Sequence, residues 1–275
     1  QCKFDRIYQL TLKLKTLTSF AILYSGKTEV GKSIDCCEKV LQFETQVKTQ
    51  REMDVMVTAQ VQLALMYLIS GWPRKTADIG EKALNLSLLV KRRSAKVQAA
   101  AVLAAGQYYM GEYQKSLQNA MAVRDLAERL NYRWWLSFLE VLIGRNHLAF
   151  GEMDKSWIFC QSAMEREEPH KNNGVYALAL SLNGSIFHLF GDTSHAEQMF
   201  EKGMSLEVKN FQTLDNFVQY ARIRGSSEPI LGIKLFEEII EQAEKNGLGL
   251  ISFQARLGRC LCSVLAQGYQ KRIES

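Results

Sequence analysis

Proline is scarce in this sequence, with 3 residues among 275, where average usage of about 5% would give roughly 14. Because proline removes a backbone hydrogen bond and clashes with the preceding turn, its scarcity is typical of long helices and argues against a β-sandwich rich in turns. Long apolar runs are missing as well. The best candidate, residues 99–105, is far shorter than the roughly 18–20 residues that a membrane span needs, so we expect no span.

Metal-binding and catalytic patterns are also missing. The six cysteines include no CxxC pair, and the four histidines lack the i, i+4 spacing and acidic neighbours of a metal site. No serine or cysteine stands beside a histidine in a nucleophile signature. We therefore expect no metal, no cofactor and no catalysis by this segment. We also expect reduced thiols and a cytoplasmic location.

The charge is modest, with a formal net charge of +5 that is spread along the chain. The densest basic spot, residues 91–93 with Lys96, is short and is expected at a helix end, where cations complement the helix dipole. A nucleic-acid surface concentrates basic charge on one face. We therefore expect protein partners and no nucleic acid.

Glycines recur at the ends of apolar, helically spaced stretches. They are Gly26, Gly71, Gly111, Gly151, Gly191, Gly225 and Gly268. Four in the middle of the chain are spaced by 40 residues, with small residues seven before each (Ala64, Ala104, Gly144, Gly184) and mostly small residues twelve after (Ala83, Val123, Ala163, Gly203).

This pattern predicts pairs of antiparallel helices. A glycine permits the left-handed residue that ends one helix, and small residues let the two helices approach closely. A single hairpin cannot bury its apolar face alone and must stack on neighbours. We predict an all-α fold, an α-solenoid of about six to seven helix hairpins, as one array over residues 1–275. Because the sequence begins with glutamine, we expect it to be a fragment of a longer chain.

The same positions resemble the tetratricopeptide repeat (TPR) family. That family's pattern of small, aromatic, glycine and small residues is matched in one repeat by Gly184, Phe187, Gly191, Ala196, Phe200 and Gly203. The match is good over residues 54–206 and weaker at both ends, and the period of 40 exceeds the family's usual 34. Long-helix repeats of this type are similar to helical arrays of large signalling proteins, such as the C-terminal region of soluble adenylyl cyclase.

The resemblance implies a concave groove lined by the first helix of each hairpin, in which partners bind. Carried over by distance from each glycine, its predicted lining includes Gln98, Tyr108, Tyr109, Phe138, Val141, Arg145, Ser185 and His188. This set is apolar and aromatic with little charge, which favours an amphipathic helix or an apolar peptide as the partner. A neighbouring part of the same chain is the alternative occupant.

Two further segments attract attention. Gly26, Gly31, Lys32 and Ser33 fit the GxxxxGK[ST] pattern of a phosphate-binding loop, which requires a strand before it and a helix after it. The residues before Gly26 have helical apolar spacing, which favours a repeat turn instead.

Adjacent tryptophans form the other segment. Trp134 and Trp135 follow Arg133, and neighbouring residues on a helix point about 100° apart. Either one fills a seam while the other faces outward as a binding hot spot beside Arg133, or both are shielded by the next hairpin.

The sequence therefore predicts a non-catalytic protein–protein interaction scaffold in the cytoplasm, acting as a signalling or complex subunit, for example within a large complex or a cytoskeletal structure. The alternative is a regulatory C-terminal segment of a larger nucleotide-using signalling enzyme, of the ATPase or adenylyl cyclase type.

Overall fold

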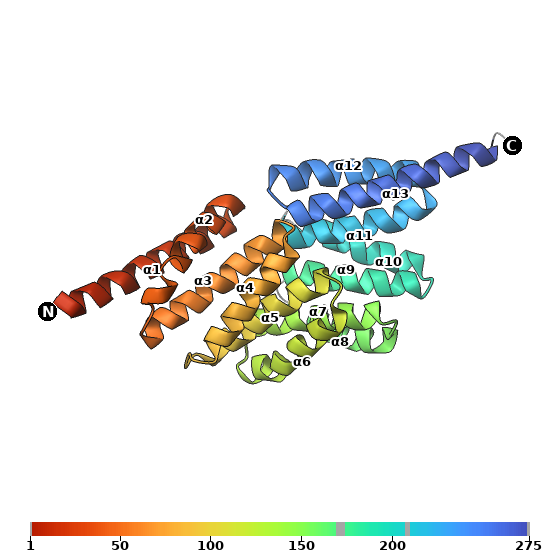
Figure 1. Ribbon diagram of the computed structural model, residues 1–275. Coiled ribbons are helices and arrows are strands. Elements are labelled where there is room, and N and C mark those ends of the chain that lie inside the picture. The colour runs from red at the N-terminus through yellow and green to blue at the C-terminus, as the bar shows by residue number, and fades with distance from the viewer. Residues whose placement is uncertain (1, 169–173, 207–209, 274–275) are drawn as a thin grey trace. The chain divides into compact units, whose positions relative to one another are not determined.

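A computed structural model describes residues 2–168, 174–206 and 210–273 of the protein (Figure 1). These residues form thirteen α-helices and one short 3-10 helix, and none of them lies in a strand. The predicted all-α class is therefore confirmed. The helices are α1 (Cys2–Gly26), α2 (Val30–Leu41), η1 (Glu44–Gln46), α3 (Gln50–Ile69), α4 (Pro73–Ser87), α5 (Arg93–Tyr109), α6 (Tyr113–Arg129), α7 (Arg133–Ala149), α8 (Met153–Glu167), α9 (Gly174–Leu189), α10 (Thr193–Met204), α11 (Phe211–Ser227), α12 (Pro229–Lys245) and α13 (Gly249–Ile273).

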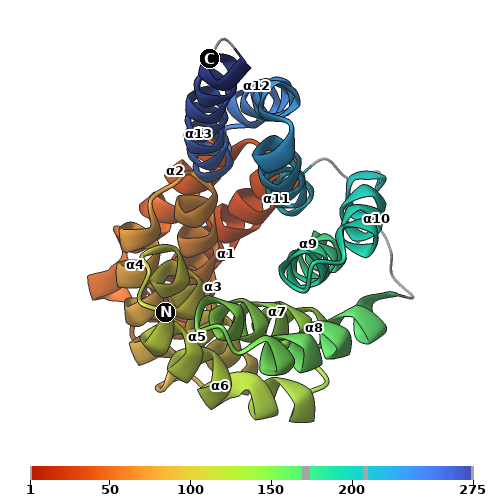
Figure 2. The same ribbon diagram turned by 90° about the vertical axis from the view of Figure 1, so that its right-hand side faces the viewer.

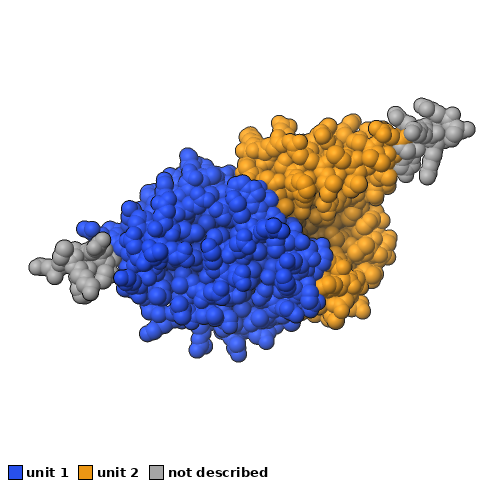
Figure 3. Space-filling model, viewed as in Figure 1, with its two compact units in different colours: residues 1–142 blue, residues 143–275 orange. Residues whose placement is uncertain are grey.

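The chain divides into two compact units, residues 1–142 and residues 143–275, with the boundary inside α7 (Figure 3). In the first unit, α3 packs on α4 and α5 packs on α6. In the second, α9 packs on α10, α11 on α12, and α12 on α13, as Figure 2 shows. Among the described residues, α1 to α12 thus follow one another as six pairs and α13 comes after them. This agrees with the six to seven hairpins predicted.

The four glycines spaced by 40 residues take the predicted turn. Gly71, Gly111, Gly151 and Gly191 have φ of +86°, +79°, +76° and +82°. At each turn the amide of the next residue donates to the carbonyl five residues before it, over 2.9 Å in all four cases. This is the bond that closes a helix on a left-handed residue. The repeat period therefore comes from one turn geometry used four times.

The prediction was wrong for the outer glycines. Gly26 is the last residue of α1, and Thr28 takes the positive φ there, at +60°. Gly225 lies inside α11 and Gly268 inside α13. At Gly225 the glycine serves close packing, because a Cβ would lie 3.2 Å from the Cα of Gly232 in α12. A glycine alone therefore does not distinguish a turn from a helix crossing.

The small positions beside each turn are buried, as predicted. Ala64, Ala104, Ala83 and Ala163 have no exposed surface. A Cβ added at Gly184 would lie 2.7 Å from the ring of Phe200 in α10. Small residues therefore set how closely the two helices of a pair approach.

Helix α3 departs from the expectation that no segment is long and apolar enough to span a membrane. It has 20 residues, an 18-residue window within it has a mean hydropathy of 1.2, and 67% of that window is buried within the fold. It begins at a capping box in which the amide of Glu52 donates to the hydroxyl of Thr49 and the Glu52 carboxylate accepts from the Thr49 amide. Its Met56 packs with Leu14 of α1 and Val40 of α2. By its packing, α3 is a core helix of the first unit.

Candidate protein-binding surfaces

The predicted groove residues lie on the first helices of successive pairs, but none is freely exposed. Val141 is buried, with 2% of its surface exposed. The others are half-buried, so they are recessed within their own unit but reachable. They are Gln98, Tyr108 and Tyr109 of α5, Phe138 and Arg145 of α7, and Ser185 and His188 of α9.

Gln98 belongs to a hydrogen-bonded network around Arg92 in the first unit. The Arg92 guanidinium donates to Asp54 Oδ1 over 2.6 Å, to the Thr58 hydroxyl over 3.0 Å and to Gln98 Oε1 over 3.1 Å. The amide nitrogen of Gln98 donates to the Tyr132 hydroxyl over 2.6 Å. Arg92 thus joins α3 to α5.

Aromatic side chains form a cluster at the end of α5. The Tyr108 ring lies 5.2 Å from that of Tyr109 and 5.4 Å from that of Tyr113 in α6, measured between ring centres. Aromatic side chains of this kind supply large contact area at low conformational cost. In the first unit, Tyr108 and Tyr109 thus form the aromatic part of the predicted groove.

The two tryptophans differ in burial. Trp135 is buried, with 8% of its surface exposed. Trp134 and Arg133 are half-buried, and the Trp134 ring stacks on Phe138 with centres 5.5 Å apart and planes 6° apart. Trp135 thus serves packing, while the role of Arg133 and Trp134 as a hot spot stays a prediction.

In the second unit, Arg145 is tied to a buried carboxylate. Its guanidinium pairs with Asp215 of α11, and the exposed fractions of the two side chains are 12% and 1%. The Ser185 hydroxyl donates to the backbone carbonyl of Ser181 over 2.9 Å. These contacts give Arg145 and Ser185 structural roles in addition to any partner contact.

The phosphate-loop pattern does not have the required context. The residues before Gly26 are helical, since α1 runs to that glycine, and α2 begins at Val30. The Ser33 hydroxyl is buried and donates to the Ala21 carbonyl over 2.8 Å. Lys32 pairs with Glu29, which raises the pKa of the lysine through their hydrogen bond. The segment is a helix–turn–helix junction.

The described part of the chain holds no group of three or more possible metal ligands. Two histidines each pair with one carboxylate, and both pairs lie at turns between helices. The Nδ1 of His147 lies 2.5 Å from Glu152 Oε2, and the Nδ1 of His195 lies 2.6 Å from Asp192 Oδ2. Hydrogen bonds from Lys155 and His147 lower the pKa of Glu152. These pairs brace the turns at Gly151 and Gly191.

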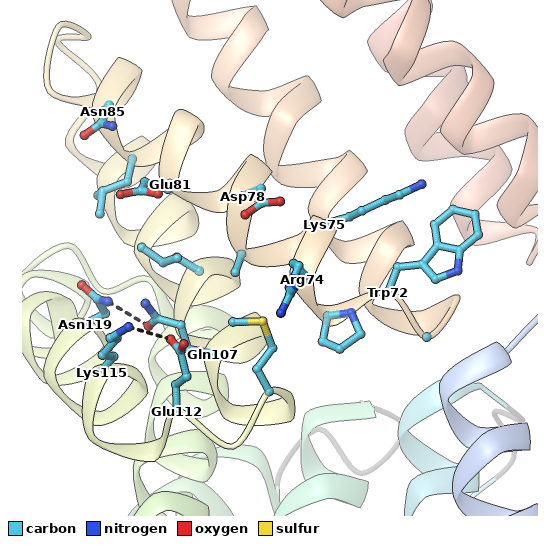
Figure 4. Close-up of a pocket in the computed structure, with 16 residues that line it drawn as sticks. Trp72, Arg74, Lys75, Asp78, Glu81, Asn85, Gln107, Glu112, Lys115 and Asn119 are labelled. Atoms are coloured by element: carbon cyan, nitrogen blue, oxygen red, sulfur yellow. Dashed lines mark hydrogen bonds and ion pairs between the residues drawn. The ribbon is translucent and has the colours of Figure 1, made fainter.

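A cleft that the sequence did not point to lies between α4 and α6 in the first unit (Figure 4). Its volume is about 1070 Å³. One wall carries Arg74, Asp78, Glu81 and Asn85, all exposed and all on α4. Their spacing of four, three and four residues puts them on one helix face, a signal visible in the sequence.

The opposite wall of this cleft comes from α5 and α6. Asn119 donates to Gln107 Oε1 over 2.9 Å, and Lys115 pairs with Glu112 over 3.1 Å (Figure 4). Trp72 stands at one end, with 45% of its surface exposed. The cleft exists because α4 and α6 both pack on α5, an arrangement that the pattern of α4 alone does not reveal.

Known proteins resemble this chain in fold but not in sequence. No family model matches the sequence, and no curated protein matches it. Among solved structures, a Rap protein complexed with Competence and Sporulation Factor has a TM-score of 0.66 and 11% identity, covering 96% of this chain and 76% of its own. The apo form of RapI has a TM-score of 0.62 and 12% identity, covering 93% and 99%.

A third similar structure is TTC0263, a thermophilic TPR protein of Thermus thermophilus. Its TM-score is 0.53 and its identity 18%, over 76% of this chain and 99% of that protein. At such low identity the likeness concerns the fold alone. The resemblance to the adenylyl cyclase region stays a prediction. The chain has a TPR-like helical-repeat fold, as the glycine spacing and the resemblance to that family together predicted.

Proposed function

We propose that this chain is a protein-interaction scaffold without catalysis of its own. The observation that carries the proposal is the TPR-like fold, shared with a Rap protein complexed with Competence and Sporulation Factor and with a Rap regulator complexed with the Phr* peptide. A stacked helical array holds its contact residues in place before binding, which lowers the ordering cost of association.

The finer proposal is that a helix or apolar peptide binds the predicted groove residues, with Tyr108 and Tyr109 as the main contacts. Two features support it. The two rings are packed edge to face and are half-buried, so they are held in place but reachable. Ten residues before Tyr108 on the same helix, a hydrogen bond from Arg92 holds the side chain of Gln98, another predicted groove residue. A rigid aromatic surface of this kind favours apolar ligands.

We also propose a reducing, cytoplasmic setting. Burial raises the pKa of the Cys37 and Cys160 thiols to about 12 in each case. Thiols with such a pKa remain protonated and react slowly. They therefore act as small apolar core residues.

Cross-linking mass spectrometry on the native protein, isolated from its own cells, tests the scaffold proposal. We expect links from α5 to another polypeptide, and we expect Tyr108→Ala/Tyr109→Ala to abolish them. Phe253→Ala is the control, because it removes an exposed aromatic side chain (64% exposed) from α13. Circular dichroism must show equal helix content in both variants.

The outcomes separate the alternatives. Links from α5 to a catalytic module of the same polypeptide would contradict the scaffold proposal and support the alternative, a regulatory segment of a larger enzyme. If the links persist in the Tyr108→Ala/Tyr109→Ala variant, the partner binds a surface that does not include these tyrosines. If no link to any other polypeptide or module forms, the scaffold proposal fails.

A further inference from the structure

The cleft between α4 and α6 is separate from the predicted groove. From α5 the cleft is lined by Leu103 and Gln107, and Met110 directly follows that helix. Gln107 and Tyr109 are two positions apart on this helix, so their side chains point about 160° apart around its axis. A ligand in this cleft would therefore meet a different face of α5 from a ligand at Tyr109.

The floor of the cleft is apolar because α4 and α5 touch closely beneath it. A Cβ added at Gly80 of α4 would lie 2.8 Å from the Cα of Leu103. Ala77, Leu84 and Met110 complete the lining around Leu103. This floor is suited to an aliphatic side chain of a ligand.

Most polar groups of the far wall and the cleft end are already engaged. Lys115 is paired with Glu112, and Gln107 accepts a hydrogen bond from Asn119. At the end near Trp72, the ammonium of Lys75 lies over the indole ring, 4.1 Å from its centre. These groups shape the cleft but have little unmet bonding capacity.

Unlike the polar groups of the far wall, three charged side chains on the α4 wall have no partner within the described residues. Arg74, Asp78 and Glu81 are exposed, and within the described residues none of them has a hydrogen bond or ion pair through its side chain. Asp78 and Glu81 are three residues apart on one face, so their carboxylates can share one cation. On the α4 side the two acidic groups, Asp78 and Glu81, are therefore balanced by two cations at the Trp72 end, Arg74 and the Lys75 ammonium that stays charged over the indole (Figure 4).

We propose that this cleft binds a basic, partly apolar peptide segment of a partner protein. A lysine or arginine of the segment lies between Asp78 and Glu81, and an adjacent aliphatic side chain lies on the floor at Leu103. Arg74 then faces a carbonyl or carboxylate of the same segment beside Trp72.

Fluorescence anisotropy with two short labelled peptides tests this inference on the purified chain. The first peptide is composed of lysine, leucine and serine, and the second has glutamate in place of lysine. We expect the lysine peptide to bind about tenfold more tightly than the glutamate peptide. Its affinity should fall as salt is raised, because screening weakens exposed charge pairs.

Charge-neutral variants locate the site. Asp78→Asn/Glu81→Gln should weaken binding of the lysine peptide about fivefold, the range expected for two exposed ion pairs. The matched control is Glu238→Gln/Glu241→Gln, an exposed acidic pair with the same spacing on α12. That control should leave the affinity unchanged.

Three results would overturn the inference. They are no binding of the lysine peptide, equal binding of both peptides, and equal losses in the α4 and α12 variants. Because all four substituted residues are exposed, equal melting temperatures are expected and exclude a folding artefact. The proposed function can fail independently, since its test substitutes Tyr108 and Tyr109 and leaves α4 unchanged.

Discussion

The carboxylate of Asp215 in α11 is paired, almost fully buried, with the guanidinium of Arg145 in α7. Removing one partner of a buried pair leaves the other charge without compensation. We expect Asp215→Ala to lower the free energy of unfolding by about 3 kcal/mol. Urea denaturation followed by circular dichroism measures it.

A double variant separates the effect of the charges from that of side-chain packing. Arg145→Met/Asp215→Leu removes both charges together, and we expect it to be more stable than Asp215→Ala alone. If the double variant is as unstable as the single one, packing rather than charge explains the loss. If Asp215→Ala is as stable as the wild type, the pair does not hold α7 to α11.

Gly151 has a left-handed backbone and open space around its missing Cβ. The cost of a side chain there is therefore confined to the backbone. We expect Gly151→Val to destabilise the protein by about 2 kcal/mol. Gly26→Ala is the contrasting change, because Gly26 ends a helix without a positive φ and also has open space.

For Gly26→Ala we expect a stability equal to that of the wild type or about 0.5 kcal/mol higher. Thermal melts of the two variants, made side by side, decide the matter. Equal melting temperatures would mean that the 40-residue turn does not require glycine at Gly151.

Gly184 illustrates the other use of glycine, which is close packing. Because its Cβ would lie 2.7 Å from the ring of the fully buried Phe200, Gly184→Ala should cost about 2 kcal/mol through overpacking. Gly184→Ala/Phe200→Leu makes room for the methyl group. Denaturation of the two single variants and the double variant should show that the costs are less than additive, and simple additivity would contradict a direct contact.

Glu52 makes the stability of the first unit depend on pH. Burial raises its pKa, but hydrogen bonds from the amides of Lys48 and Thr49 outweigh burial, so the pKa lies below its ordinary value of 4.5. The unfolded carboxyl therefore binds more protons than the folded one near that pH. The stabilisation is present above pH 4.5 and is lost as pH falls through the folded pKa.

Glu52→Gln removes this titration. We expect the wild type to lose stability more steeply than the variant as the solution is acidified below the ordinary glutamate pKa, measured by urea midpoints across that range. Parallel pH profiles would show that the Thr49 capping box does not contribute through the charge of Glu52.

The fold was predictable because one physical requirement repeats along the chain. Each hairpin needs a left-handed turn residue and small contact positions, and Gly71, Ala64 and Ala83 satisfy both requirements in sequence. The prediction failed where other residues meet the same requirement. Thr28, and not the predicted Gly26, adopts the positive φ between α1 and α2, and a threonine gives no periodic signal.

The surfaces were harder to predict because burial depends on neighbouring helices. The groove positions were transferred by spacing, which cannot show that Val141 is buried or that Arg145 has a carboxylate partner. The α4 cleft was missed for a related reason. The row from Arg74 to Asn85 is visible in the sequence, but the cavity beside it depends on how α4 and α6 pack on α5.

Because the four turns share one geometry, the number of hairpins between them can change without a change in the turn. Gly71, Gly111, Gly151 and Gly191 end their helices with the same hydrogen bond at the same length. Recombination between two neighbouring ones would delete or duplicate a 40-residue segment and rejoin the chain at a turn with the same geometry as the one it replaced. Such an array can change its length by whole hairpins without creating a new kind of junction.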